Sequence, residues 1–167
     1  DMDTIIAHYQ PEIDTIKKYG LTITQAHSPF PAYDITNPAF MDYAIETYKK
    51  CIKLCEYAEC PRIVIHGISR RPHEWDMTDE DVRALNMKLY TALIPTLKTS
   101  NVTVLLENLF ASSNGRRYAG VCSNAYDAIE YIDTLNDLAG KECFGLCFDV
   151  GHLNIIHCSM HDYVLKL

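Results

Sequence analysis

The sequence predicts an α/β fold built on a parallel sheet, and two observations lead to this prediction. Four short runs are dense in β-branched and apolar residues, and longer segments with helical signals separate them in strict alternation. Such alternation is typical of α/β proteins, whose parallel strands are joined by right-handed crossovers. With 167 residues and no linker, low-complexity tract or charge run, residues 1–167 are expected to form a single domain.

The four predicted strands are short runs dense in β-branched and apolar residues. Runs of this kind indicate strands that are buried on both faces of a sheet. The four runs are Leu21–Ala26, Arg62–Ile65, Val102–Leu106 and Phe144–Phe148.

The predicted helices begin and end at recognisable signals. The first runs to Tyr19 and ends at Gly20, a residue that tolerates the left-handed backbone of a helix end. The second begins at Asn37, with Pro38 in the first helical position, and continues to about Glu59.

Similar signals mark two further helices, and another helix is predicted to begin after the last strand. Thr78 and Asp81 form a capping box that opens the third helix, which Pro95 is expected to kink or end. Ser123 is the predicted cap of the fourth helix, which ends near Gly140.

Composition excludes several classes of protein. No apolar run reaches the roughly 18 residues of a membrane span, and the first residues lack the pattern of a secretory signal. The net charge of −7 makes nonspecific nucleic-acid binding unfavourable. The seven cysteines include no C-x-x-C pair, so we expect reduced thiols in a cytoplasmic protein.

One polar residue stands directly after each predicted strand: His27, His66, Glu107 and Asp149, at separations of 39, 41 and 42 residues. In parallel α/β folds the carboxyl ends of the strands form the ligand site. Histidine and carboxylate side chains are also ligands of zinc, manganese and magnesium. The four residues therefore predict a metal site.

Each of these residues also has a structural interpretation. His27 could begin a loop, and His66 could be a hydrogen-bonded histidine at the rim of the core. Glu107 could form a structural salt bridge, because a buried carboxylate needs a partner. Asp149 is followed by His152, a further candidate ligand.

The other histidines are expected to carry no function. We expect His8 and His73 to be solvated. His157 and His161 stand four residues apart, as helical zinc ligands do, but an isolated pair at that spacing is weak evidence for a metal.

The motifs Leu-Leu-Glu-Asn at 105–108 and Phe-Asp-Val-Gly-His at 148–152 resemble those of the xylose isomerase-like TIM-barrel superfamily. This superfamily includes sugar-phosphate isomerases, epimerases and relatives of endonuclease IV. The resemblance implies that Glu107 and Asp149 bind a divalent metal (Mn, Mg, Co or Zn), and that His152 binds substrate or metal. The resemblance to the superfamily also includes His27 and His66, and it covers almost the whole chain.

The resemblance implies a (β/α)8 barrel, of which this chain supplies about four consecutive units, strands 2 to 5. A complete barrel needs about 250 residues. The later ligands of the superfamily, a His after strand 6 and a Glu after strand 8, would lie beyond Leu167. We therefore expect residues 1–167 to be an incomplete barrel that is inactive alone.

The expected function is a metal-dependent isomerase or epimerase that acts on a sugar, sugar phosphate or related polyol, with Glu107 as an acid/base and a homo-oligomer as a possible state. Arg70 and Arg71 could hold a phosphate or carboxylate, or could simply be exposed. The alternatives are an endonuclease IV-like phosphodiesterase, which explains His27 and His66 better, and a barrel without catalysis.

Overall fold

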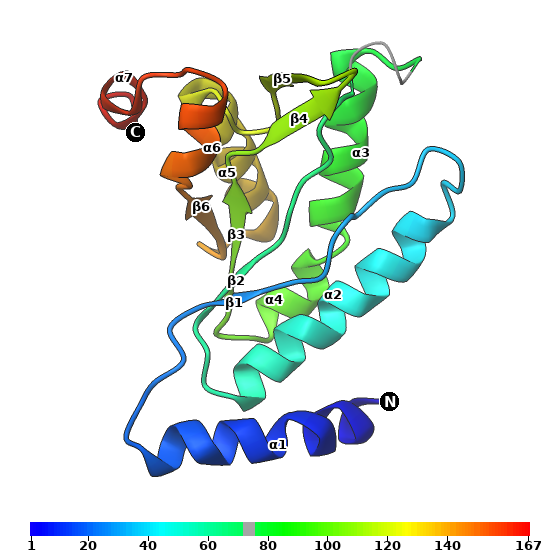
Figure 1. The fold of residues 1–167 in the computed structure, drawn as a ribbon. Coiled ribbons are helices and arrows are strands. Elements are labelled where there is room, and N and C mark those ends of the chain that lie inside the picture. Colours follow the sequence, from blue (N-terminus) through cyan, green and yellow to red (C-terminus); the bar gives the residue numbers. More distant parts are fainter. Residues whose placement is uncertain (72–75) are drawn as a thin grey trace.

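A computed structural model, which describes residues 1–71 and 76–167, contains a four-stranded parallel sheet. Neighbouring strands pair in the order β1-β2-β3-β6, so the strands that the sequence predicted are adjacent in chain order (Figure 1). This confirms the parallel α/β prediction. The strands are β1 (Ala26–His27), β2 (Arg62–Val64), β3 (Thr103–Glu107) and β6 (Phe144–Cys147).

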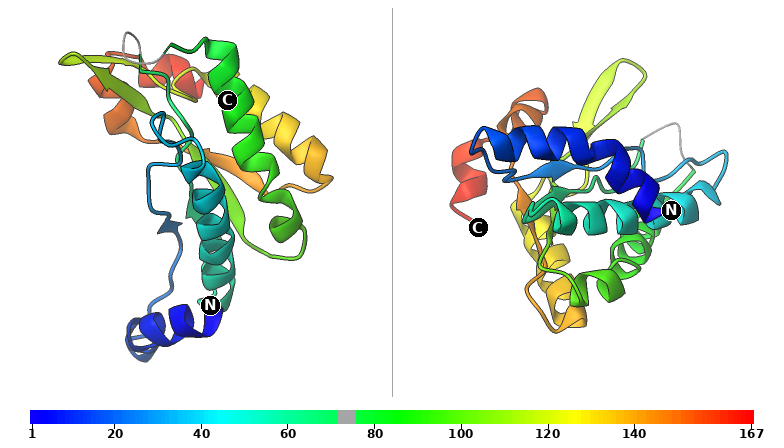
Figure 2. Two further views of the ribbon diagram at one scale, coloured as in Figure 1. Left: turned by 90° about the vertical axis from the view of Figure 1, so that its right-hand side faces the viewer. Right: turned by 90° about the horizontal axis from the view of Figure 1, so that it is seen from below.

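Seven helices occur in the described parts of the chain. The long helices α2, α3 and α5 lie on one side of the sheet, and α1 lies at the end of the molecule opposite a β-hairpin (Figures 1 and 2). Among the described residues, no helix combines the length and apolar character needed to cross a bilayer. The helices are α1 (Met2–Lys18), α2 (Phe40–Tyr57), α3 (Asp79–Thr91), α4 (Ile94–Lys98), α5 (Ala125–Ala139), α6 (Val150–Ile155) and α7 (Met160–Val164).

The main core lies between the sheet and these helices. Val104 and Leu106 of β3 are fully buried in it, together with residues such as Leu89 of α3. Side chains alternate between the two faces of a strand, so Leu105 and Glu107 point to the other face. The strand therefore contributes apolar side chains to the core and a carboxylate to the opposite side of the sheet.

The first predicted strand is much shorter than expected. It was predicted over Leu21–Ala26, but only Ala26 and His27 form β1. This strand lies at the edge of the sheet and pairs only with β2, through two residue pairs. Residues 21–25 have strand-forming side chains but no ladder partner, and Leu21 is exposed.

Two predicted N-caps are wrong. Ala39, not Asn37, precedes α2, because the Phe40 N–H bonds the Asn37 carbonyl in a turn before the helix. Asn124, not Ser123, caps α5, because its side chain accepts the N–H of Tyr126.

The other helix signals are confirmed. The Thr78–Asp81 capping box opens α3, and Gly140 ends α5 with a left-handed backbone. The helix before Pro95 stops at Thr91, and a new helix, α4, begins at Ile94.

A β-hairpin that the sequence analysis did not predict follows β3. It consists of β4 (Phe110–Ser113) and β5 (Arg116–Ala119), and it projects from the molecule (Figure 2). Asn114 and Gly115 form its two-residue turn, and both have positive φ, of 49° and 72°. An Asn-Gly pair is a strong signal for this turn type, so the sequence contained the information.

Candidate metal centre

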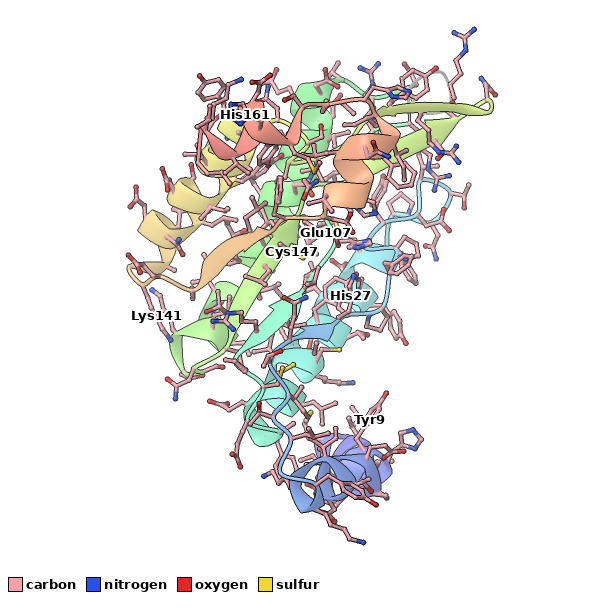
Figure 3. The ribbon with its side chains drawn as sticks, turned by 60° about the vertical axis from the view of Figure 1, so that its left-hand side comes forward. Tyr9, His27, Glu107, Lys141, Cys147 and His161 are labelled. Carbon is pink, nitrogen blue, oxygen red and sulfur yellow. The ribbon has the colours of Figure 1, made fainter. Side chains whose placement is uncertain are left out.

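Glu107 is the hub of a cluster of side chains at the carboxyl ends of the strands. It is the last residue of β3, and only 7% of its side chain is exposed. Its Oε2 lies 2.8 Å from His66 Nε2 and 3.6 Å from His27 Nε2. The two histidine nitrogens are 3.0 Å apart. Figure 3 shows Glu107 and His27 in the same region of the molecule.

The second carboxylate oxygen of Glu107 faces another part of the cluster. His152 Nδ1 lies 3.2 Å from Glu107 Oε1 and 3.9 Å from Asp149 Oδ2. Glu107 therefore belongs to two groups of three candidate ligands, one with His27 and His66 and one with Asp149 and His152. Within each group, the ligand atoms all lie within 4.8 Å of one another.

The first group fits a divalent cation. A tetrahedral zinc site has bonds of about 2.0–2.2 Å, which places neighbouring ligand atoms about 3.4 Å apart. The separations among His27, His66 and Glu107, from 2.8 to 3.6 Å, are close to that value. A single proton on His66 Nε2 can bond either His27 Nε2 or the carboxylate, whereas one cation would satisfy all three atoms.

Hydrogen bonds to backbone carbonyls set the tautomers of two histidines. His27 Nδ1 lies 2.7 Å from the Ser28 carbonyl oxygen, which can only accept, so Nδ1 carries the proton. The lone pair of Nε2 is then directed at His66 and Glu107, which is the arrangement of a metal-binding histidine. His152 Nδ1 lies 3.0 Å from the Asn108 carbonyl oxygen, so here Nδ1 is the donor.

Asp149 also has a structural role that the sequence analysis did not assign. Its Oδ1 accepts the backbone N–H of His152 at 2.8 Å and caps α6. The other oxygen, Oδ2, faces the ring of His152. The cap fixes the orientation of the carboxylate and leaves one oxygen for a ligand.

Two aromatic rings that the sequence analysis missed flank the cluster. Phe30 stacks on His66 with ring centroids 4.6 Å apart, and Phe110 meets His152 edge to face at 5.0 Å. These four residues line one cavity of about 480 Å³. Each phenylalanine stands three positions after a candidate ligand, but that spacing alone would not have identified it.

The structure separates the two candidate anion-binding arginines. Arg71 lines the cavity beside His66 and His152, whereas Arg70 pairs with Asp79 at 3.1 Å and lines a different cavity, between α3 and α5. Arg70 and Arg71 therefore do not form one anion-binding site together.

The remaining histidines lie away from the cluster. His8, His157 and His161 are exposed, and His161 lies on α7 (Figure 3). His73, which was expected to be solvated, falls outside the described residues.

Comparisons with known proteins agree with this architecture. The xylose isomerase-like TIM barrel family matches residues 14–164. A search of curated protein sequences finds no match.

Three similar solved structures are sugar epimerases or are named after one. A D-tagatose 3-epimerase-like protein has a TM-score of 0.76 and 16% identity, over 95% of this chain and 55% of that protein. For 3-keto-D-glucoside 4-epimerase from E. coli, the TM-score is 0.73 and the identity is 18%, over 100% of this chain and 64% of that protein. D-allulose 3-epimerase from Methylomonas sp., in complex with D-allulose, has a TM-score of 0.64 and 16% identity, over 92% of this chain and 51% of that protein.

These likenesses show a partial TIM-barrel fold, as the motifs predicted, and the chain spans 51–64% of the three similar proteins. Parallel strands, ligand-type side chains at their carboxyl ends and a family match over nearly the whole chain all agree. The chain belongs to the xylose isomerase-like TIM-barrel family.

Proposed function

We propose that this protein is a divalent-metal-dependent isomerase or epimerase of a sugar, a sugar phosphate or a related polyol. The observation that carries the proposal is the group of Glu107, Asp149 and His152, whose ligand atoms all lie within 4.8 Å of one another. The names of the similar solved structures support the substrate class. The chain supplies the second to fifth strand units of the barrel, as a single domain over residues 1–167.

Glu107 and Asp149 hold the metal in this proposal. When bound, the metal polarises the substrate carbonyl and stabilises the negative charge that develops on its oxygen. Glu107 removes the proton from the carbon next to that carbonyl. In an isomerase it returns the proton to the neighbouring carbon on the same face, and in an epimerase the second acid/base, after a later strand, supplies the proton to the opposite face. Phe30 and Phe110 line the cavity beside the cluster.

His152 binds substrate oxygen in this proposal. Its ring is held by the Asn108 carbonyl on one side and by the edge of Phe110 on the other. Arg71, which lines the same cavity, is placed to contact a phosphate or carboxylate of the substrate.

Metal binding by the chain tests the first half of the proposal. Chelator-treated protein is titrated with Co²⁺, whose visible absorption reports coordination by nitrogen and oxygen ligands. We expect one or two ions per chain, and weaker binding in Glu107→Gln and in Asp149→Asn. His161→Gln on α7 is the control, because its exposed ring lies outside the cluster. Unchanged binding in Glu107→Gln contradicts the proposal.

Turnover tests the second half. The resemblance implies another acid/base after a later strand, so the assay needs a protein with all eight strands. We expect Mn²⁺, Mg²⁺, Co²⁺ or Zn²⁺ to restore activity on a panel of ketoses after chelation. Both variants abolish turnover, and excess metal partly restores Asp149→Asn but not Glu107→Gln, because the latter has also lost its proton-transfer group. Full activity of either variant, or of the stripped enzyme, contradicts this mechanism.

A metal-dependent phosphodiesterase is the second candidate, and the His27–His66–Glu107 group favours it. His27→Gln separates the two functions. In an isomerase or epimerase that uses Glu107 and Asp149, this variant keeps most of its activity. In a phosphodiesterase it loses hydrolysis of an aryl phosphodiester, because one metal ligand is missing.

A further inference from the structure

Asn108 connects the two sides of the candidate metal centre. It follows Glu107 directly, is fully buried, and reaches across to the segment after β6. Its side-chain Oδ1 accepts the N–H of Asp149 at 2.6 Å, and its Nδ2 donates to the Asp149 carbonyl at 2.8 Å. The ladder between β3 and β6 ends at the pair Glu107–Cys147, so Asn108 continues the connection where the strands stop pairing.

The backbone of Asn108 holds a second candidate ligand. Its carbonyl accepts from His152 Nδ1 at 3.0 Å. One residue thus contacts the peptide group of Asp149 through its side chain and the ring of His152 through its main chain. Since Asp149 and His152 also interact through the cap of α6, these contacts form a closed set.

We infer that Asn108 is a positioning residue that sets the distance from Glu107 to Asp149 and His152. This inference rests on the proposed metal function. An amide is the side-chain group that offers an acceptor and a donor in one plane, so it can bond both the N–H and the C=O of one residue. In Asn108→Ala both bonds are lost. In Asn108→Asp the acceptor remains, but a carboxylate oxygen faces the Asp149 carbonyl.

The chain contains a matched control. Asn136 of α5 makes the same paired contact with Phe144, at the other end of β6: its Oδ1 accepts the Phe144 N–H at 2.9 Å, and its Nδ2 donates to the Phe144 carbonyl at 3.1 Å. It also accepts the N–H of Cys143. Asn136→Ala therefore removes equivalent bonds at the start of β6, away from the cluster.

The test compares Asn108→Ala, Asn108→Asp and Asn136→Ala with the wild-type chain. The first readout is Co²⁺ affinity. We expect it to fall about 10-fold to 100-fold in both Asn108 variants, as is typical when a residue that orients ligands is lost. Asn136→Ala keeps wild-type affinity, although urea unfolding shows that it is less stable.

The second readout needs no metal. The ring-nitrogen chemical shifts of His152 in the metal-free protein report its tautomer. We expect them to move in the Asn108 variants, because loss of the side-chain bonds to Asp149 shifts His152 relative to the Asn108 carbonyl, but not in Asn136→Ala. Asn108→Asp keeps the shape of the side chain, so it serves if Asn108→Ala does not fold.

The outcomes separate this inference from the proposed function. Wild-type protein that binds no Co²⁺ contradicts the proposed function, and the His152 shifts then decide the inference alone. Wild-type protein that binds Co²⁺, with equal affinity and unmoved His152 shifts in the Asn108 variants, overturns the inference. An equal loss of affinity in Asn136→Ala also overturns it, because the effect would then come from general destabilisation.

Discussion

Glu107 shows how one buried side chain can join two ligand groups. A carboxylate that leaves water is costly unless charges or hydrogen bonds compensate it. Here its Oε2 faces His66 and His27, and its Oε1 faces His152. The ion-pair partners of Glu107 among the described residues are all histidines, so the alternative of a structural salt bridge stays open. These partners are residue types that also bind divalent metals.

Two aspartates have pKa values that are shifted in opposite directions. Burial raises the pKa of Asp127, and hydrogen bonds from Thr36 lower the pKa of Asp34. When folding raises the pKa of a group, that group stabilises the folded state at pH values below its pKa in the unfolded chain. This stabilisation is lost as the pH rises through its pKa in the folded chain. When folding lowers the pKa of a group, that group stabilises the folded state at pH values above its pKa in the unfolded chain. This stabilisation is lost as the pH falls through its pKa in the folded chain.

We therefore predict opposite pH dependences for the two asparagine variants. From about pH 3 to about pH 7, Asp127→Asn becomes more stable relative to the wild type, and Asp34→Asn becomes less stable. Urea unfolding at several pH values measures both differences. Differences of the same sign in the two variants contradict the assigned shifts.

At the scale of secondary-structure elements, backbone hydrogen bonds hold the β4–β5 hairpin to the segment that directly follows Glu107 and Asn108. The Gly120 N–H bonds the Leu109 carbonyl at 3.0 Å, and the Leu109 N–H bonds the Val121 carbonyl at 2.9 Å. A side chain at Gly120 would lie 2.6 Å from the Leu109 carbonyl oxygen and from Ser69 Oγ. The hairpin therefore approaches the backbone after Glu107 and Asn108 as closely as a glycine allows.

Two glycine variants test this anchor. Gly120→Ala is expected to cost about 3 kcal/mol or more, because a backbone oxygen cannot move aside. Gly115→Ala costs about 1 kcal/mol, since its Cβ meets no atom within 4 Å and only the positive φ opposes it. The free energy of unfolding in urea measures both, and equal costs contradict the close approach.

At the scale of the whole molecule, a metal that binds the folded cluster must stabilise the chain. A ligand at 100 times its Kd that binds only the folded state adds about 2.7 kcal/mol. For a chain of this size that corresponds to a rise in Tm of about 5–10 °C.

We predict this rise in thermal unfolding of the wild-type chain with added Zn²⁺, and its reversal by a chelator. Glu107→Gln is the matched variant, because both ligand groups share this residue. It should show little or no rise. An equal rise in the variant means that the metal binds elsewhere.

Some signals that act over three or four residues were read correctly from the sequence, but the N-caps of α2 and α5 and the Asn114–Gly115 turn were not. The Thr78–Asp81 capping box and the Gly140 helix end are set by neighbouring residues, and the alternation of strands and helices predicted a parallel sheet. The residue types at the strand ends also predicted which side chains would meet, because parallel strands present their carboxyl ends at one edge.

Only the tertiary structure decided the features that depend on partners distant in sequence. β1 is short because a strand extends only as far as its neighbour pairs with it, and residues 21–25 have no such neighbour. The division of the Glu107 oxygens between two groups and the contact of Asn108 with Asp149 join residues about 41 positions apart. Their geometry depends on the curvature of the sheet and on the loop after each strand, and no local sequence pattern encodes either.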